Sequence, residues 1–192
     1  MKKSIVGTLA VALLCLLPLA SQASAQEGNA SPLFQGPLLI TSAGQSPDVQ
    51  LAVILARRAG IEYTLSQMAT GQDLDGAGSL AVVVGASLKG LGAAGIDTAR
   101  EQERVREILT AAASRNIPIL FLHLGGEPRR GQLTDEMIIE YLPLSQWALV
   151  LQSGNHDGLF TRLARENNVP LVEVERTADG AEVLKVAFEP AS

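Results

Sequence analysis

The sequence predicts an α/β fold: a three-layer, doubly wound and mainly parallel sheet of five or six strands, with a Rossmann-like or a flavodoxin-like strand order. Three observations support this prediction. Apolar runs with the length of buried strands recur along the chain. Segments with helical periodicity alternate with them, which favours parallel pairing and right-handed crossovers. Four polar, glycine-bearing turns each follow a strand-like run, as expected at the carboxyl-end rim of a parallel sheet, where ligands bind.

Each expected strand is a short apolar run between turn-forming residues. The weakest, residues 62–68, alternates in polarity and fits a sheet edge, whereas the valine-rich run at 80–84 fits a strand covered on both faces. In chain order, the expected strands are residues 37–41, 62–68, 80–84, 117–124, 147–151 and 170–174.

Each expected helix has a start or a stop signal. Ser46 is the expected N-cap of the first, with Pro47 at its first position, and Gly60 ends it. Thr98 and Glu101 match a capping box for the second helix, which continues to residue 115. The later helices are expected at residues 135–141, capped by Thr134, at 157–167 and at 181–188.

The first 25 residues have the features of an export signal. Lys2 and Lys3 precede an apolar run from Ile5 to Leu19, and Ala23-Ser24-Ala25 is a small-residue cleavage site. We expect an exported protein, periplasmic or extracellular, with no stable membrane span after cleavage. The sequence also allows the signal to be retained as an anchor, because signals and anchors look alike.

Cleavage would leave 167 of the 192 residues, as a flexible lead-in over 26–36 and a single α/β domain over 37–188. Cys15 lies in the signal, so the mature chain would have neither a disulfide nor a thiolate metal site. Because the signal holds two lysines and no acidic residue, its loss changes the net charge from −5 to −7. This acidity argues against nucleic acid and anionic membranes as partners.

The turn from Thr41 to Ser46 leads straight into a helix. Free backbone N–H groups and the helix dipole favour an anion at such a start, and Ser42 and Gln45 could add donors. The alternative is an ordinary βα turn in which Ser46 only caps its helix.

Residues Gly90 to Gly95 match the G-x-G-x-x-G pattern of dinucleotide sites, but their context does not. The motif starts five residues after Gly85, and no acidic residue ends the next strand to hold a ribose. We therefore expect no cofactor. We interpret residues 85–95 as a glycine-rich loop that could act as a lid and place Lys89 over a ligand.

The turn from His123 to Gly131 is the most polar. His123 should lie near the rim, and Arg129 and Arg130 could offer bidentate forks to a carboxylate or a phosphate. The alternatives are a hydrogen-bonded core histidine and two solvated arginines. The fourth turn, residues 153–158, has Asp157 as a possible helix cap, with Asn155 and His156 projecting from the turn.

Little in the sequence supports catalysis. No G-x-S-x-G elbow surrounds Ser42, Ser87 or Ser153. His123 and His156 lack local metal-ligand spacing, so we expect no metal site, although they could form an acid–base pair.

Taken together, the segments TSAGQS, GLGAAGID, GGEPRRG and SGNHDG resemble an uncharacterised family of exported bacterial single-domain α/β proteins, classified only as a domain of unknown function. The resemblance spans about residues 37–188. It implies a signal peptide and one small domain, and brings no established substrate, cofactor or catalytic residue.

The first functional hypothesis is an exported module that binds a small anionic molecule, a carboxylate or a phosphate ester, at the carboxyl-end rim of the sheet. One alternative is a small hydrolase or transferase that uses His123 or His156. Another is an accessory interaction domain whose partner is a membrane transporter or an envelope enzyme. The expected ligand-binding residues are Ser42, Gln45, Ser46, Lys89, His123, Arg129, Arg130, Asn155 and His156.

Overall fold

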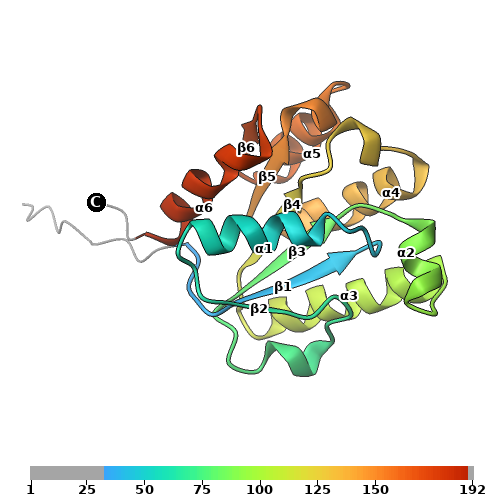
Figure 1. The fold of residues 1–192 in the computed structure, drawn as a ribbon, viewed down its shortest axis with the longest axis horizontal. Coiled ribbons are helices and arrows are strands. Elements are labelled where there is room, and N and C mark those ends of the chain that lie inside the picture. Colours follow the sequence, from blue (N-terminus) through green and yellow to red (C-terminus); the bar gives the residue numbers. More distant parts are fainter. Residues whose placement is uncertain (1–32, 190–192) are drawn as a thin grey trace, which may run out of the picture.

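Six parallel strands form one sheet in the computed structural model of the chain, which describes residues 33–189 (Figure 1). The spatial order is β2-β1-β3-β4-β5-β6. This is the flavodoxin-like order, so the structure decides between the two that the sequence left open and confirms the predicted parallel α/β class. The strands are β1 (Leu38–Ala43), β2 (Tyr63–Leu65), β3 (Ser79–Val84), β4 (Ile119–His123), β5 (Trp147–Leu151) and β6 (Leu171–Val174).

Helices cover both faces of the sheet. On one face lie α1 (Val49–Arg58) and α6 (Gly180–Phe188), and on the other α3 (Thr98–Ser114), α4 (Gln132–Tyr141) and α5 (Leu159–Asn167). A short helix, α2 (Leu88–Ala93), follows the carboxyl end of β3. The predicted signal segment and most of the lead-in lie outside the described residues. No helix within residues 33–189 has the length and apolar character needed to cross a bilayer.

The central strand β3 shows why the sheet is buried on both faces. It pairs in register with β1 and β4, and all six of its residues are buried. Leu80, Val82 and Val84 pack toward the α3–α5 face, while Ala81 and Val83 pack toward α1 and α6. Successive side chains of β3 thus point alternately into the two cores. Because both faces are buried, the strand has to be an uninterrupted run of apolar residues from Leu80 to Val84.

The first helix begins later than expected, since α1 starts at Val49 with Asp48 rather than Ser46 at its N-cap. Two further expected capping contacts are replaced by others. Asp97, rather than Thr98, caps α3, and its carboxylate accepts a hydrogen bond from the Arg100 N–H at 2.8 Å. Glu101 therefore does not take part in a capping box, and its side chain points into the protein interior. Thr134 lies inside α4, which begins at Gln132, and its hydroxyl accepts a hydrogen bond from the Ala86 N–H at 3.0 Å.

Adjacent isoleucines on α4 test this packing. Ile138 is fully buried, whereas Ile139 is 51% exposed. Ile138→Ala should lower the free energy of unfolding by about 2–5 kcal/mol, because it leaves a cavity in the core. Ile139→Ala is the matched control and should change it by less than about 0.5 kcal/mol. Urea denaturation measures both, and equal losses would contradict the packing described.

Candidate functional site

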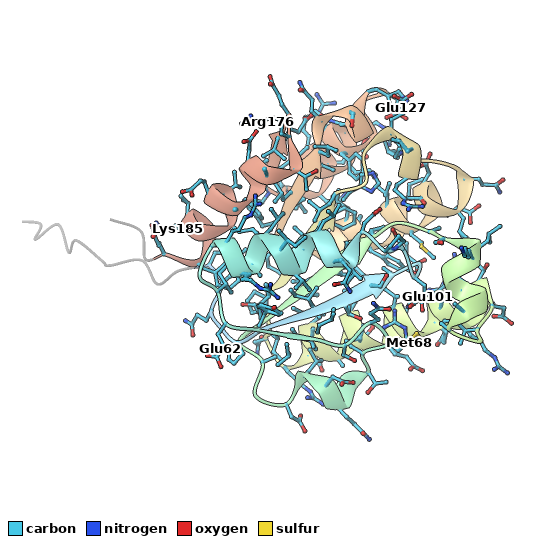
Figure 2. All side chains as sticks on the ribbon, viewed as in Figure 1. Glu62, Met68, Glu101, Glu127, Arg176 and Lys185 are labelled. Atoms are coloured by element: carbon cyan, nitrogen blue, oxygen red, sulfur yellow. The ribbon has the colours of Figure 1, made fainter. Side chains whose placement is uncertain are left out.

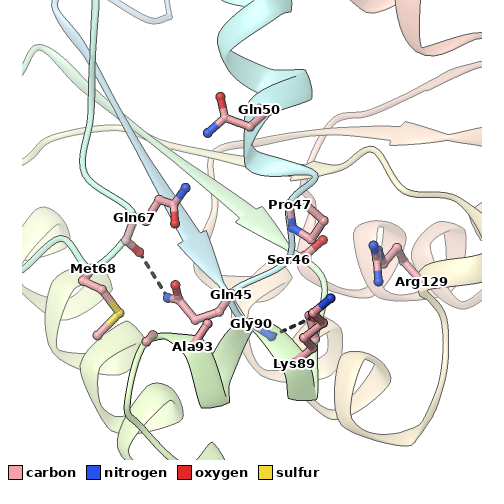
Figure 3. A pocket seen from close by; sticks show the side chains of 12 residues that line it. Gln45, Ser46, Pro47, Gln50, Gln67, Met68, Lys89, Gly90, Ala93 and Arg129 are labelled. Atoms are coloured by element: carbon pink, nitrogen blue, oxygen red, sulfur yellow. Dashed lines mark hydrogen bonds between the residues drawn. The ribbon is translucent and has the colours of Figure 1, made fainter.

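A cavity of about 810 Å³ opens at the carboxyl ends of β1 and β3 (Figure 3). From β1 the chain crosses to β2 on one side, and β3 then lies on the other side of β1. The cavity therefore occupies the topological switch point of the sheet, where open α/β folds bind ligands. Its walls come from the β1–α1 turn, Gln67 and Met68 after β2, residues of α2, and Arg129.

The structure brings together only some of the residues predicted from the sequence. Four of them line the cavity: Gln45, Ser46, Lys89 and Arg129. The other five do not line it: Ser42, His123, Arg130, Asn155 and His156. Three lining residues that the sequence analysis missed are Gln50, Gln67 and Met68.

The turn after β1 is held tightly against the end of β3. Gly44 has a φ of +103°, and a Cβ there would lie 2.6 Å from the Gly85 carbonyl oxygen. The Gly44 carbonyl accepts a hydrogen bond from the Ser87 N–H at 2.8 Å. Gln45 follows with a φ of +57°, a left-handed conformation that is uncommon outside glycine. The backbone thus turns the Gln45 side chain to the cavity wall.

The predicted glycine-rich lid is instead largely helical. Residues Leu88–Ala93 form α2, and Ser87 caps it by accepting a hydrogen bond from the Gly90 N–H at 3.1 Å. A Cβ at Gly90 would overlap the carbonyl oxygen of Gln45, so this glycine allows α2 to pack directly on the turn. α2 is thus a helical wall of the cavity that packs on the turn after β1. Lys89 projects from its first turn, is exposed, and forms no ion pair within residues 33–189.

Beneath the cavity lies a buried ion pair that the sequence analysis did not identify. Glu101 of α3, which Figure 2 labels, is fully buried and pairs with Arg104 at 2.9 Å. Its Oε1 also accepts hydrogen bonds from the Gly44 N–H at 2.8 Å and from Gln45 Nε2 at 2.9 Å. Arg104 in turn donates to the carbonyl oxygens of Ser42 and Ala69. The pair therefore ties α3 to the turn after β1.

Adjacent arginines in the turn after β4 have opposite environments. All five N–H groups of Arg130 are used, by Asp135, Asp157 and the Gly154 carbonyl, and its side chain is 7% exposed. The side chain of Arg129 donates only its Nε–H within residues 33–189, to Asp48 at 2.9 Å. The guanidinium end of Arg129 is turned toward Ser46 and Lys89 (Figure 3). Arg129 can bind a ligand and Arg130 is a structural residue.

His123 lies in the core and is separated from the cavity. Its Nδ1 is 3.0 Å from the Val84 carbonyl oxygen and its Nε2 is 3.2 Å from that of Gly126. Burial lowers the pKa of His123, against the raising effect of these two carbonyls. The hydrogen-bonded core histidine, which was the alternative from the sequence, is the arrangement observed.

The other predicted residues serve local structure. Asn155 Oδ1 accepts a hydrogen bond from the Phe160 N–H at 3.0 Å and so helps to cap α5, which begins at Leu159. His156 is exposed, with Nδ1 3.3 Å from the Ser153 carbonyl oxygen. Ser42 is buried, and its hydroxyl has no hydrogen-bond partner among the described residues.

The lining suits binding of an anion better than acid–base chemistry. Within residues 33–189 the cavity wall includes no histidine, aspartate or glutamate, and two cations, Lys89 and Arg129, face it. Over the same residues no group of three or more histidine, cysteine, aspartate or glutamate side chains could hold a metal ion.

The fold and this cavity define a flavodoxin-like α/β domain with a candidate ligand site at the switch point. The sequence over residues 35–188 matches the family described as "Domain of unknown function (DUF6305)", so the chain belongs to that family. The resemblance found from the sequence motifs to an uncharacterised single-domain family is thereby confirmed. A comparison with curated proteins found no match.

Several solved structures of hydrolases are distantly similar to this chain. A G-D-S-L family lipolytic protein from Desulfitobacterium hafniense shares 12% identity, with 72% of this chain and 77% of that chain covered and a TM-score of 0.35. A GDSL-like lipase from Bacteroides thetaiotaomicron shares 9% sequence identity, with 71% of this chain and 66% of that chain covered and a TM-score of 0.33. AlinE4, an SGNH-hydrolase family esterase, shares 17% sequence identity, with 70% of this chain and 73% of that chain covered and a TM-score of 0.28. At these scores their activity does not transfer to this chain.

Removal of Glu101 tests the ion pair beneath the cavity. Glu101→Ala should lower the free energy of unfolding by about 3–5 kcal/mol, because it leaves the Arg104 guanidinium buried without a counter-charge. Glu103→Ala, two residues away and 63% exposed, is the control and should cost less than about 1 kcal/mol. Chemical denaturation measures both variants, and similar losses would contradict a structural role for Glu101.

The lowered pKa of His123 predicts a pH dependence of stability. The unfolded chain takes up a proton near pH 6.5, whereas the buried ring resists protonation. The contribution of His123 is therefore fully present above about pH 6.5 and declines as the pH falls toward its lower folded-state pKa. Unfolding measured between about pH 7.5 and pH 5 should show a smaller loss for His123→Leu than for the native chain. Equal losses in the two proteins would contradict the effect of burial on His123.

Proposed function

We propose that this protein is exported and binds a small organic anion in the cavity between the β1–α1 turn and α2. The observation that carries the proposal is that two cationic side chains, Lys89 and Arg129, line the same cavity. Within the described residues, Lys89 has no acidic partner and the terminal N–H groups of Arg129 are free. A bidentate guanidinium suits a carboxylate or a phosphate ester, and an ammonium group adds charge. The rest of the chain is acidic, so the cavity attracts anions that the surface repels.

In this arrangement the charge comes from side chains rather than from the start of α1. Ser46 Oγ already accepts a hydrogen bond from the Asp48 N–H at 3.1 Å, and Pro47 has no N–H to offer. The Asp48 carboxylate instead holds Arg129 in place through Nε. The anion would therefore contact Arg129 and Lys89, while the Gln50 and Met68 positions contact the organic part of the molecule.

The proposal is tested by titrating the domain with malate, citrate and glycerol 3-phosphate and recording melting temperature and binding heat. A ligand at 100 times its Kd should stabilise the native chain by about 2.7 kcal/mol. Lys89→Ala combined with Arg129→Ala should weaken binding at least about tenfold, because each charged hydrogen bond is worth about 1.5–3 kcal/mol.

The control variant is Lys185→Ala, which removes a lysine on α6, outside the cavity lining. It should bind like the native chain. Unchanged affinity in the double variant would show that the anion binds somewhere else, and no binding by any probe to the native chain would overturn the proposed ligand class.

A further inference from the structure

We propose that the cavity selects carboxylates that also carry a hydrogen-bond donor, a hydroxyl or an amino group, because Gln45 presents a fixed and unpaired acceptor to the ligand. This inference rests on the proposed function, since it concerns the same cavity. It adds the chemical class of the ligand, hydroxy- or amino-carboxylates, to the general requirement for an anion.

The orientation of the Gln45 carboxamide follows from its two partners. Nε2 donates to Glu101 Oε1 at 2.9 Å and to the Gln67 carbonyl oxygen at 3.2 Å (Figure 3 shows the second bond). Both partners are acceptors, so the amide nitrogen must face them and both of its hydrogens are used. The oxygen, Oε1, is therefore the only polar atom of this side chain left for a ligand.

That oxygen has no donor among the described residues and belongs to a nearly buried residue on the cavity lining. Gln45 is 7% exposed and lines the cavity, and no described residue donates to its Oε1. A ligand that fills the cavity shields this oxygen from water, so only a donor on the ligand keeps it hydrogen-bonded. An otherwise identical ligand without a donor leaves the oxygen unpaired and so binds more weakly.

The amide cannot turn over to suit a different ligand. A flip would place Oε1 against the Glu101 carboxylate, whose position Arg104 and the Gly44 N–H fix at 2.9 and 2.8 Å. The Gln45 backbone is also held, by its φ of +57° and by the packing of α2 at Gly90. Glu101 is thus a positioning residue: it sets which atom of Gln45 meets the ligand without reaching the cavity itself.

The chemical class of the ligand follows from the cations and the Gln45 acceptor taken together. The terminal N–H groups of Arg129 and the ammonium of Lys89 take the carboxylate. Gln45 Oε1 takes a hydroxyl or amino hydrogen on the same molecule, and no lining carboxylate repels the anion within residues 33–189.

The test uses pairs of ligands with one carbon skeleton: malate and aspartate against succinate, and lactate against propionate. Calorimetry on the native domain should give a Kd about tenfold to a hundredfold lower for the member with a donor. In Gln45→Met the two members of each pair should bind equally. Gln45→Asn retracts the amide, keeps a residue that tolerates positive φ, and should lose the preference in the same way.

Gln67→Ala is the matched control. Its side chain lines the cavity, but Gln45 is held by its backbone carbonyl, so the preference should persist. Equal binding of both members to the native domain would overturn the selectivity while leaving anion binding intact. A preference that survives in folded Gln45→Met and Gln45→Asn would also overturn it. If no carboxylate binds, the proposed function itself fails.

Discussion

Glu101 and Arg104 lie one turn apart on α3 and form a buried ion pair at the place where β1 ends. The carboxylate holds the backbone N–H of Gly44 and the side chain of Gln45, and the guanidinium holds carbonyl oxygens of Ser42 and Ala69. A buried pair of this kind adds little net stability over apolar residues of the same volume, yet losing one partner is costly. Its main effect here is geometric, because it fixes three separate segments of chain around one wall of the cavity.

The other wall depends on the same turn. α2 packs against the Gln45 carbonyl, which is possible only because residue 90 is a glycine. Lys89 therefore takes its position from a backbone that Glu101 also holds. Arg129 is positioned independently, by Asp48 at the start of α1. The two cations that face the cavity thus reach it from different elements, and the Arg129 guanidinium is already held by Asp48 before a ligand arrives.

Much of the fold could be predicted from the sequence because its signals are local. Buried parallel strands read as continuous apolar runs, so the six strands and their alternation with helices were found. The order of the strands could not be found, since the position of β2 at one edge depends on pairing that leaves no mark in a single segment. Helix starts were less certain, because Asp97 and Thr98 are both good caps and only the structure shows which one is used.

The site could be predicted only in part, because some of its features depend on contacts between residues far apart in the sequence. The rim turns were recognised, but Arg129 and Arg130 are identical neighbours, and what separates them is Asp157, 27 residues from Arg130. Glu101 did carry a local signal, since it lies on the buried stripe of α3 with Val105, Ile108 and Ala112. A charged residue on such a stripe has to be paired, and Arg104 is within reach one turn later. Reading that stripe would have located the ion pair without the structure.

A helical α2 that packs on the turn after β1 changes how this domain can achieve specificity. A mobile lid gains selectivity by closing over the correct ligand, and ordering the lid costs conformational entropy. Here the acceptor on Gln45 and the Arg129 guanidinium are already held by protein contacts, so little ordering of these two groups is needed when a ligand binds. Selectivity must then come from what each fixed group rejects. Under the proposed function, Arg129 and Lys89 would disfavour cations, and Gln45 Oε1 would disfavour ligands that cannot donate a hydrogen bond to it. A preorganised cavity of this kind discriminates by leaving its own polar atoms unpaired when the wrong molecule enters.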